Sequence, residues 1–349
     1  MAHTTQPTKA SKPINNIVAS LKQTQKAYLA RRPHRSFRRT RRRDYVRPLA
    51  LPGYFSFSNY VRKTLWAHRK MFFLLALTYS IITAILVGIA SQDTYSSLSD
   101  AINQTSGDLF SGNLGAIGKA GLLFFTAISG GISSNLTATE GVYAALIILI
   151  SWLTTIWLLR NILAGHKVKL RDGLYNATAP LLSTLLVGFV FILDLVPLAI
   201  AIRGYVAAQS TGLLNGGVEA MLFWLAAGLL TLLSLYLATS TFIALVVITL
   251  PGMYPIQAIR TAGDLVIGRR IRILLRLLWL GLSVALSWAV IMIPIILFDG
   301  WLKALWHAIS WLPLVPIVLL VLGALTVIWS TSYIYLLYRR IVADDSAPA

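Results

Sequence analysis

The most informative stretch of this chain is LPGMYPIQAIRTAGDLVIGRRIRILLRL, residues 250–277, because a related stretch, LPGYFSFSNYVRKTLWAHRKMFFLLAL, occupies residues 51–77. Each stretch has the pattern of a turn, a short amphipathic helix, a basic pair and the start of an apolar helix. At a spacing of 200 positions the matching residues are Tyr54 and Tyr254, Leu65 and Leu265, Arg69 and Arg269, Lys70 and Arg270, Leu74 and Leu274, Leu75 and Leu275, and Leu77 and Leu277. The two stretches therefore predict an internal repeat.

The composition is typical of a polytopic membrane protein. Of the 349 residues, 56% are hydrophobic and 12% are charged, and the mean hydropathy is +0.70. A bilayer-spanning helix needs about 20 predominantly apolar residues, and this chain has several such runs. The chain contains no cysteine, which excludes disulfides, Cys-ligated zinc and iron–sulfur clusters. The five histidines show no metal spacing, so the sequence predicts no metal and no cofactor.

Six apolar runs predict an all-α fold with six membrane spans. A further Gly-rich apolar piece at residues 115–131 has only about 14 apolar residues, which favours a re-entrant or interfacial helix over a span. The membrane domain is expected to cover residues 51–340, and residues 341–349 form a short tail. The predicted spans are residues 71–90, 142–159, 177–202, 220–250, 273–298 and 312–338.

The distribution of basic residues predicts the orientation of these spans, because Lys and Arg stay preferentially on the cytoplasmic side. With both termini inside, all of the 31 lysines and arginines except Lys119, Arg203 and Lys303 lie on the cytoplasmic side. A seventh span through residues 115–131 would instead export the later basic loops. Six spans with both ends cytoplasmic is therefore the prediction, in the cytoplasmic membrane of a cell.

A third, weaker copy of the amphipathic element is HKVKLRDGLYNATAP, His166–Pro180, and it also precedes a span. The chain then divides into three units, each made of a cytoplasmic-face amphipathic helix, an outgoing span and a returning span. Units of this kind usually pack against one another around a shared interior.

The N-terminal arm, residues 1–50, is strongly basic. Residues 1–43 contain no Asp or Glu, and Arg31–Arg43 carries eight of the arginines behind the net charge of +19. Such a segment is expected to be a largely disordered cytoplasmic tail, and a cleaved mitochondrial transit peptide is the alternative. Its charge suits anionic lipids, nucleic acid or ribosomes, and its closeness to the first span favours lipid. The candidate lipid contacts in the arm are Arg38, Arg39, Arg41, Arg42 and Arg43.

Two phrases of the membrane domain, LLRNILAGHKVKLRDGLYNATAPLL and PIQAIRTAGDLVIGRRIRILLRLL, resemble signatures of a known family. This is the helical membrane domain attached to some bacterial glycerophosphoryl diester phosphodiesterases, together with stand-alone inner-membrane relatives of unknown role. The resemblance covers roughly residues 55–340 and implies a helical membrane domain. The chain has no soluble α/β barrel and no acidic metal cluster, so the phosphodiesterase activity does not carry over.

Asp194, in the stretch FVFILDLVPLA, is the acidic residue that the pattern places well inside a span. An ionised carboxylate there costs about 2.5 to 3.5 kcal/mol on insertion scales, so such a residue usually faces the interior of a bundle. Arg203 follows nine residues later, too far along a straight helix for pairing unless Pro197 breaks it. A partner from another span, such as Tyr or Ser, or water is required. Asp194 is either a proton or cation site or a satisfied polar anchor.

A second cluster consists of arginines at the start of the fifth span. Arg269, Arg272 and Arg276 fall at positions i, i+3 and i+7 and share one helix face, with Arg270 beside them. They are candidate contacts for anionic lipid headgroups, each contributing roughly 1 kcal/mol. The alternative is that they only mark the cytoplasmic side.

These patterns predict a non-enzymatic, lipid-interacting or scaffold component of the cytoplasmic membrane. No nucleophile-elbow pattern or converging acid and histidine pair points to catalysis. A small transporter that uses Asp194 is the first alternative, tethering of nucleic acid or ribosomes by the basic arm is the second, and an intramembrane lipid-modifying enzyme is the least favoured. A homo-oligomer and a membrane-protein partner both stay open.

Overall fold

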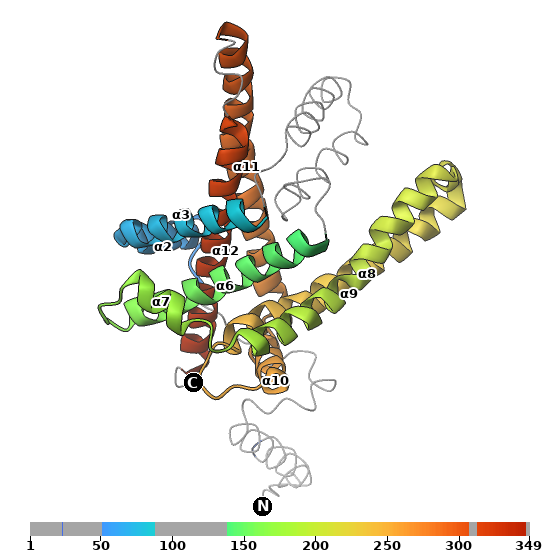
Figure 1. Cartoon of the computed structure of the whole chain (residues 1–349). Coiled ribbons are helices and arrows are strands. Elements are labelled where there is room, and N and C mark those ends of the chain that lie inside the picture. The colour runs from blue at the N-terminus through green and yellow to red at the C-terminus, as the bar shows by residue number, and fades with distance from the viewer. Residues whose placement is uncertain (1–22, 24–50, 88–137, 307–312, 347–349) are drawn as a thin grey trace, which may run out of the picture. The chain divides into compact units, whose positions relative to one another are not determined.

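The computed structural model describes residues 51–87, 138–306 and 313–346, together with Gln23 (Figure 1). All the described helices belong to the unit Pro48–Ala349. The predicted disorder of the N-terminal arm, its candidate lipid contacts and the re-entrant segment at residues 115–131 fall outside the described residues. These predictions therefore stay untested.

Six of the described helices are long and apolar enough to cross a membrane, which confirms the prediction of six candidate spans. Throughout the described ranges the regular secondary structure is helical, in agreement with the predicted all-α class. The bounds of the long helices are α3 Arg69–Leu86, α6 Ala138–Leu163, α8 Leu181–Ser210, α9 Gly217–Val247, α11 Arg270–Leu305 and α12 Leu314–Ser346.

Several helices extend beyond the apolar runs that predicted them. α8 continues to Ser210, past the predicted end at residue 202, and α11 continues to Leu305, past residue 298. Hydropathy marks only the part of a helix that hydrocarbon surrounds, whereas backbone hydrogen bonding continues through polar residues at either end. Pro197 does not break the helix, because α8 runs through it.

Short helices precede three of the long ones. They are α2 Tyr54–Ala67, α7 Leu170–Asn176 and α10 Pro255–Val266, and a 3₁₀ turn, η2 Leu213–Asn215, joins α8 to α9. The order of the described helices is therefore short, long, long, three times over. α2 ends at Ala67 because the chain leaves helical geometry at His68, and the basic pair that follows begins α3.

α10 shows how a short helix is anchored. Its residues Ala258, Ala262 and Val266 are fully buried and recur every fourth position, so they form one apolar stripe.

Gly252, in the turn before α10, has a φ of 77°. Only glycine adopts this left-handed region without a steric penalty, so the residue fits the sharp turn out of α9.

The hydrophobic core lies where the short helices meet the long ones. Phe57 and Val61 of α2 are fully buried, and the Phe57 ring meets the Tyr333 ring of α12 edge-on at 4.8 Å. The same cluster includes the second half of α9 and all three buried residues of α10. By contrast, α8 packs mainly along α9 (Figure 1) and exposes most of its apolar residues. These exposed side chains need lipid or another apolar surface to cover them.

Candidate functional site

The candidate arginines at the start of α11 do not share one exposed surface. Arg269 is 3% exposed and its Nη1 donates to the carbonyl of Ile341 at 3.2 Å, while Arg276 is 6% exposed and its Nη2 donates to the carbonyl of Pro52. Little of either side chain is therefore left for contact with a lipid headgroup, and the predicted lipid contacts stay untested. Both side chains turn inward, and a backbone carbonyl accepts a hydrogen bond from each.

Aromatic rings contact two of these arginines. The guanidinium of Arg276 lies 4.2 Å from the ring centre of Tyr54, and that of Arg270 lies 3.7 Å from the ring centre of Tyr236. Arg270 also donates to the carbonyl of Tyr236 at 3.1 Å. Cation–π contact of this kind stabilises a charge that has lost water. Of the four arginines predicted here as lipid contacts, Arg272 is exposed, Arg270 is partly exposed and the other two are buried.

Further basic residues bring other helix ends to the same part of the molecule. Arg160, at the end of α6, donates to the carbonyl of Thr249 just after α9 at 3.1 Å. Arg340, near the end of α12, is exposed and lies 5.5 Å from the ring centre of Tyr60 on α2. These contacts, with those of Arg269, join the ends of α6, α9 and α12 to the start of α11 and to α2.

Asp194 finds its partner on the neighbouring helix. Thr241 of α9, 3% exposed, donates from its hydroxyl to the Asp194 carboxylate, and the Ser234 hydroxyl donates to the Asp194 backbone carbonyl at 2.5 Å. The sequence required a partner from another span, and that partner is a threonine. Asp194 lines none of the three cavities described below. This geometry favours a satisfied polar anchor.

A second acid within a candidate span was missed because it follows the predicted end of the fifth span. Asp299 is 1% exposed and its Oδ2 lies 2.8 Å from Nζ of Lys303. The two residues are four positions apart on α11, a spacing at which side chains face each other on a helix. The i, i+4 spacing of these opposite charges is the sequence pattern that could have indicated that the helix continues and that the two residues pair. Pairing makes burial of Asp299 tolerable.

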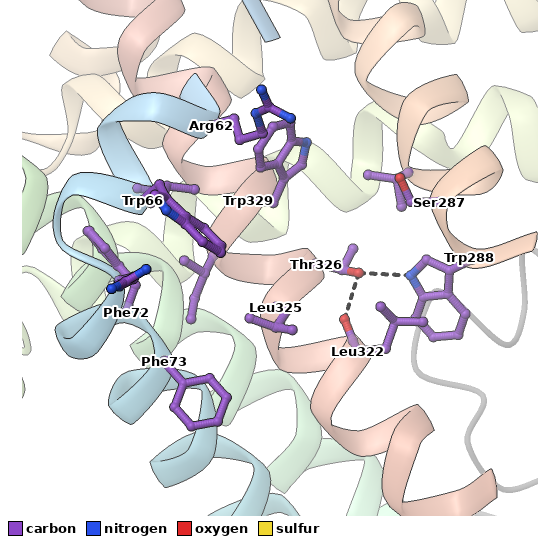
Figure 2. A pocket seen from close by; sticks show the side chains of 14 residues that line it. Arg62, Trp66, Phe72, Phe73, Ser287, Trp288, Leu322, Leu325, Thr326 and Trp329 are labelled. Carbon is purple, nitrogen blue, oxygen red and sulfur yellow. Dashed lines mark hydrogen bonds between the residues drawn. The ribbon is translucent and has the colours of Figure 1, made fainter. Parts of the chain in front are cut away.

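The largest of three described cavities is a groove of about 460 Å³ between α2–α3 on one side and α11–α12 on the other. We call it the tryptophan groove, after Trp66, Trp288 and Trp329 in its lining. Figure 2 shows Trp66 and Phe73 on one side and Trp288 on the other. A volume of this size falls within the range of about 300 to 1,000 Å³ that is usual for small-molecule sites.

Around Trp288 the polar groups of the groove lining are paired within the protein. Trp288 is 2% exposed and donates from Nε1 to the Thr326 hydroxyl at 2.8 Å, and that hydroxyl donates in turn to the carbonyl of Leu322 at 2.7 Å (Figure 2). Because these polar groups are already paired within the protein, an occupant meets ring and methyl surface there. The wall is suited to hydrocarbon.

Two arginines provide the charge in the lining of the tryptophan groove. Arg62 donates from Nη2 to the Asn59 side-chain oxygen at 2.8 Å, and the Arg69 guanidinium lies 5.4 Å from the ring centre of Trp66. Within the described part of the chain, neither guanidinium pairs with a carboxylate. The groove therefore combines an apolar wall with an uncompensated positive pair, a combination that the sequence did not reveal because its residues come from positions 62–73 and 284–329.

The other two cavities are smaller. One of about 370 Å³ includes Arg160, Asn176 and Ser183 in its lining, and one of about 90 Å³ lies between α3, α6 and α12 with Tyr79 and Ser151. Among the residues that the structure describes, no group of three or more His, Asp or Glu side chains is placed to hold a metal ion.

The six long apolar helices define a multi-pass α-helical membrane protein. Comparisons with protein-family models, with curated proteins and with solved structures found no match. The resemblance to the membrane domain of the phosphodiesterase family thus stays a prediction from the two quoted phrases.

Proposed function

We propose that this protein is a non-enzymatic, lipid-interacting or scaffold component of a cytoplasmic membrane, with both termini on the cytoplasmic side. Its membrane domain consists of three repeated units, each a short amphipathic helix followed by two spans. The short–long–long order of the described helices supports this division, as does the match between residues 51–77 and 250–277.

One observation carries the proposal. Apart from Arg203 and Lys303, every described lysine and arginine lies on or beside a short helix, or near the end of a long helix that faces one. A bilayer concentrates basic groups at its cytoplasmic surface, where the leaflet is anionic and each Lys or Arg near the surface contributes about 1 kcal/mol. The basic end of the molecule is therefore the end that contacts anionic headgroups.

Two alternatives from the sequence have less support. A transporter that binds a proton or cation at Asp194 needs access to that carboxylate, but the Thr241 hydroxyl donates to it and none of the three described cavities includes it. Tethering of nucleic acid or ribosomes depends on residues 1–50, which lie outside the described helices. The lipid-interacting interpretation remains the best supported.

Quenching of the ten native tryptophans by brominated lipids tests the proposal. We expect brominated phosphatidylglycerol to be enriched around the reconstituted protein relative to brominated phosphatidylcholine with the same chains. The enrichment should decrease as salt rises, because screening weakens headgroup contacts. Equal quenching by the two lipids at low salt would contradict the proposal, and solute flux into the same vesicles would favour the transporter.

A further inference from the structure

We propose that the tryptophan groove is a specific site for one anionic glycerophospholipid. The headgroup phosphate binds between Arg62 and Arg69, and part of one acyl chain lies along the wall that ends at Trp288. This inference rests on the proposed lipid-interacting function and adds the lipid class and the residues of the site.

Charge complementarity identifies the headgroup. Arg62 and Arg69 are exposed, line the groove and lack a carboxylate partner in the described part of the chain. A planar guanidinium donates two parallel hydrogen bonds to phosphate oxygens. The contact between Arg62 and Asn59 and the stacking of Arg69 on Trp66 hold both groups near the groove before a ligand arrives, which reduces the entropy lost on binding.

The shape of the groove identifies the hydrocarbon. On α12 the lining runs from Trp329 to Leu322, a distance of about 10 Å at the rise of an α-helix. This length accommodates part of one acyl chain, while the remainder of the lipid lies in the bilayer. Phe73 and Leu325, which are 60% and 38% exposed, form the side of the groove that an acyl chain would cover.

The source of the ligand follows from the elements that form the groove. Its walls include α3, α11 and α12, which are candidate spans, and its charged residues lie within the amphipathic helix α2 and at the first residue of α3. A molecule in this place has its anionic group at the headgroup level and its apolar part at the acyl level. A soluble phosphate would leave the apolar wall uncovered.

The test uses two matched double variants of the full chain. Arg62→Gln with Arg69→Gln removes the groove charges, whereas Lys63→Gln with Lys70→Gln removes the same net charge from neighbouring exposed positions that do not line the groove. Native mass spectrometry of the detergent-purified protein titrated with phosphatidylglycerol gives the dissociation constant of the first lipid. We expect the double arginine variant to raise this dissociation constant about 30-fold and the double lysine variant to raise it less than threefold.

A third variant tests the apolar wall without changing charge. Ser287→Trp adds bulk at an exposed position in the groove lining, and Leu286→Trp adds bulk beside it at an exposed position outside the lining. Of these two variants, we expect only Ser287→Trp to weaken binding of the first phosphatidylglycerol molecule. This pair keeps the proposal testable if the double arginine variant does not fold.

Each remaining outcome separates the site from the general function. If the double arginine and double lysine variants lost equal affinity for phosphatidylglycerol, or if the two tryptophan variants did, the groove site would be overturned and the proposed function would still stand. Wild-type binding that does not distinguish phosphatidylglycerol from phosphatidylcholine would overturn both. Displacement of the bound lipid by inorganic phosphate alone would assign the arginines to a soluble anion, whereas retention of the lipid supports the proposal.

Discussion

At the scale of single residues, the arginines on α11 differ although their spacing makes them look equivalent. Arg272 is exposed, while Arg269 and Arg276 are almost fully buried against backbone carbonyls. Such contacts replace part of the water that a buried charge loses. Periodicity locates a face of one helix, but it carries no information about whether another segment covers that face.

The hydrogen bond between Thr241 and Asp194 gives a prediction at this scale. Thr241→Val removes the hydroxyl that donates to the carboxylate, and we expect it to lower the free energy of unfolding by about 1 to 3 kcal/mol, because a polar group inside the membrane loses its partner. Thermal unfolding in detergent measures the loss.

The matched control for Thr241→Val is Thr231→Val. The Thr231 hydroxyl donates only to the carbonyl of Ala227 on its own helix, at 2.8 Å. A loss for Thr241→Val no larger than that of this control would mean that the contact between α8 and α9 contributes no stability through Asp194.

At the scale of elements, the turns that release the short helices depend on backbone geometry. Gly252 has a φ of 77°, and a Cβ added there would meet no atom within 4 Å, so any cost of substitution is backbone strain alone. We expect Gly252→Ala to destabilise the protein by about 1 to 2 kcal/mol. Chemical or thermal unfolding of the purified variant measures this cost.

Gly281→Ala is the comparison for Gly252→Ala. Gly281 lies within α11, where alanine is compatible with the backbone, and its Cβ would also have open space. This variant should therefore be neutral or slightly stabilising. If both substitutions gave the same change, the turn before α10 would not require left-handed geometry.

At the scale of the whole molecule, the absence of cysteine from the chain makes the proposed topology directly measurable. Lys169→Cys reports on the start of α7 and Thr211→Cys on the turn between α8 and α9, and both positions are exposed. In right-side-out vesicles, we expect a membrane-impermeant maleimide to label position 211 and to leave position 169 protected until the membrane is opened. The reverse pattern would invert the proposed orientation.

Much of the fold was predictable because a helix that crosses a bilayer must be apolar over a minimum length. Six apolar runs predicted six candidate spans, and the amphipathic stretches that precede three of them predicted the short helices α2, α7 and α10. Helix ends were less predictable: α11 includes Asp299 and Lys303, which hydropathy assigned to a loop. Their mutual pairing at 2.8 Å offsets part of the penalty that a hydropathy argument assigns to each charge separately.

The sequence by itself determined the class of the protein and its candidate spans, because these follow from the transfer of local side chains between water and hydrocarbon. Only the tertiary structure decided which arginines are buried, that Thr241 is the partner of Asp194, and that Arg62 and Arg69 lie beside a wall formed by Trp288 and Trp329. The physical reason is that charge pairing and cavities depend on distances between segments far apart in the chain, and these distances are set by helix packing.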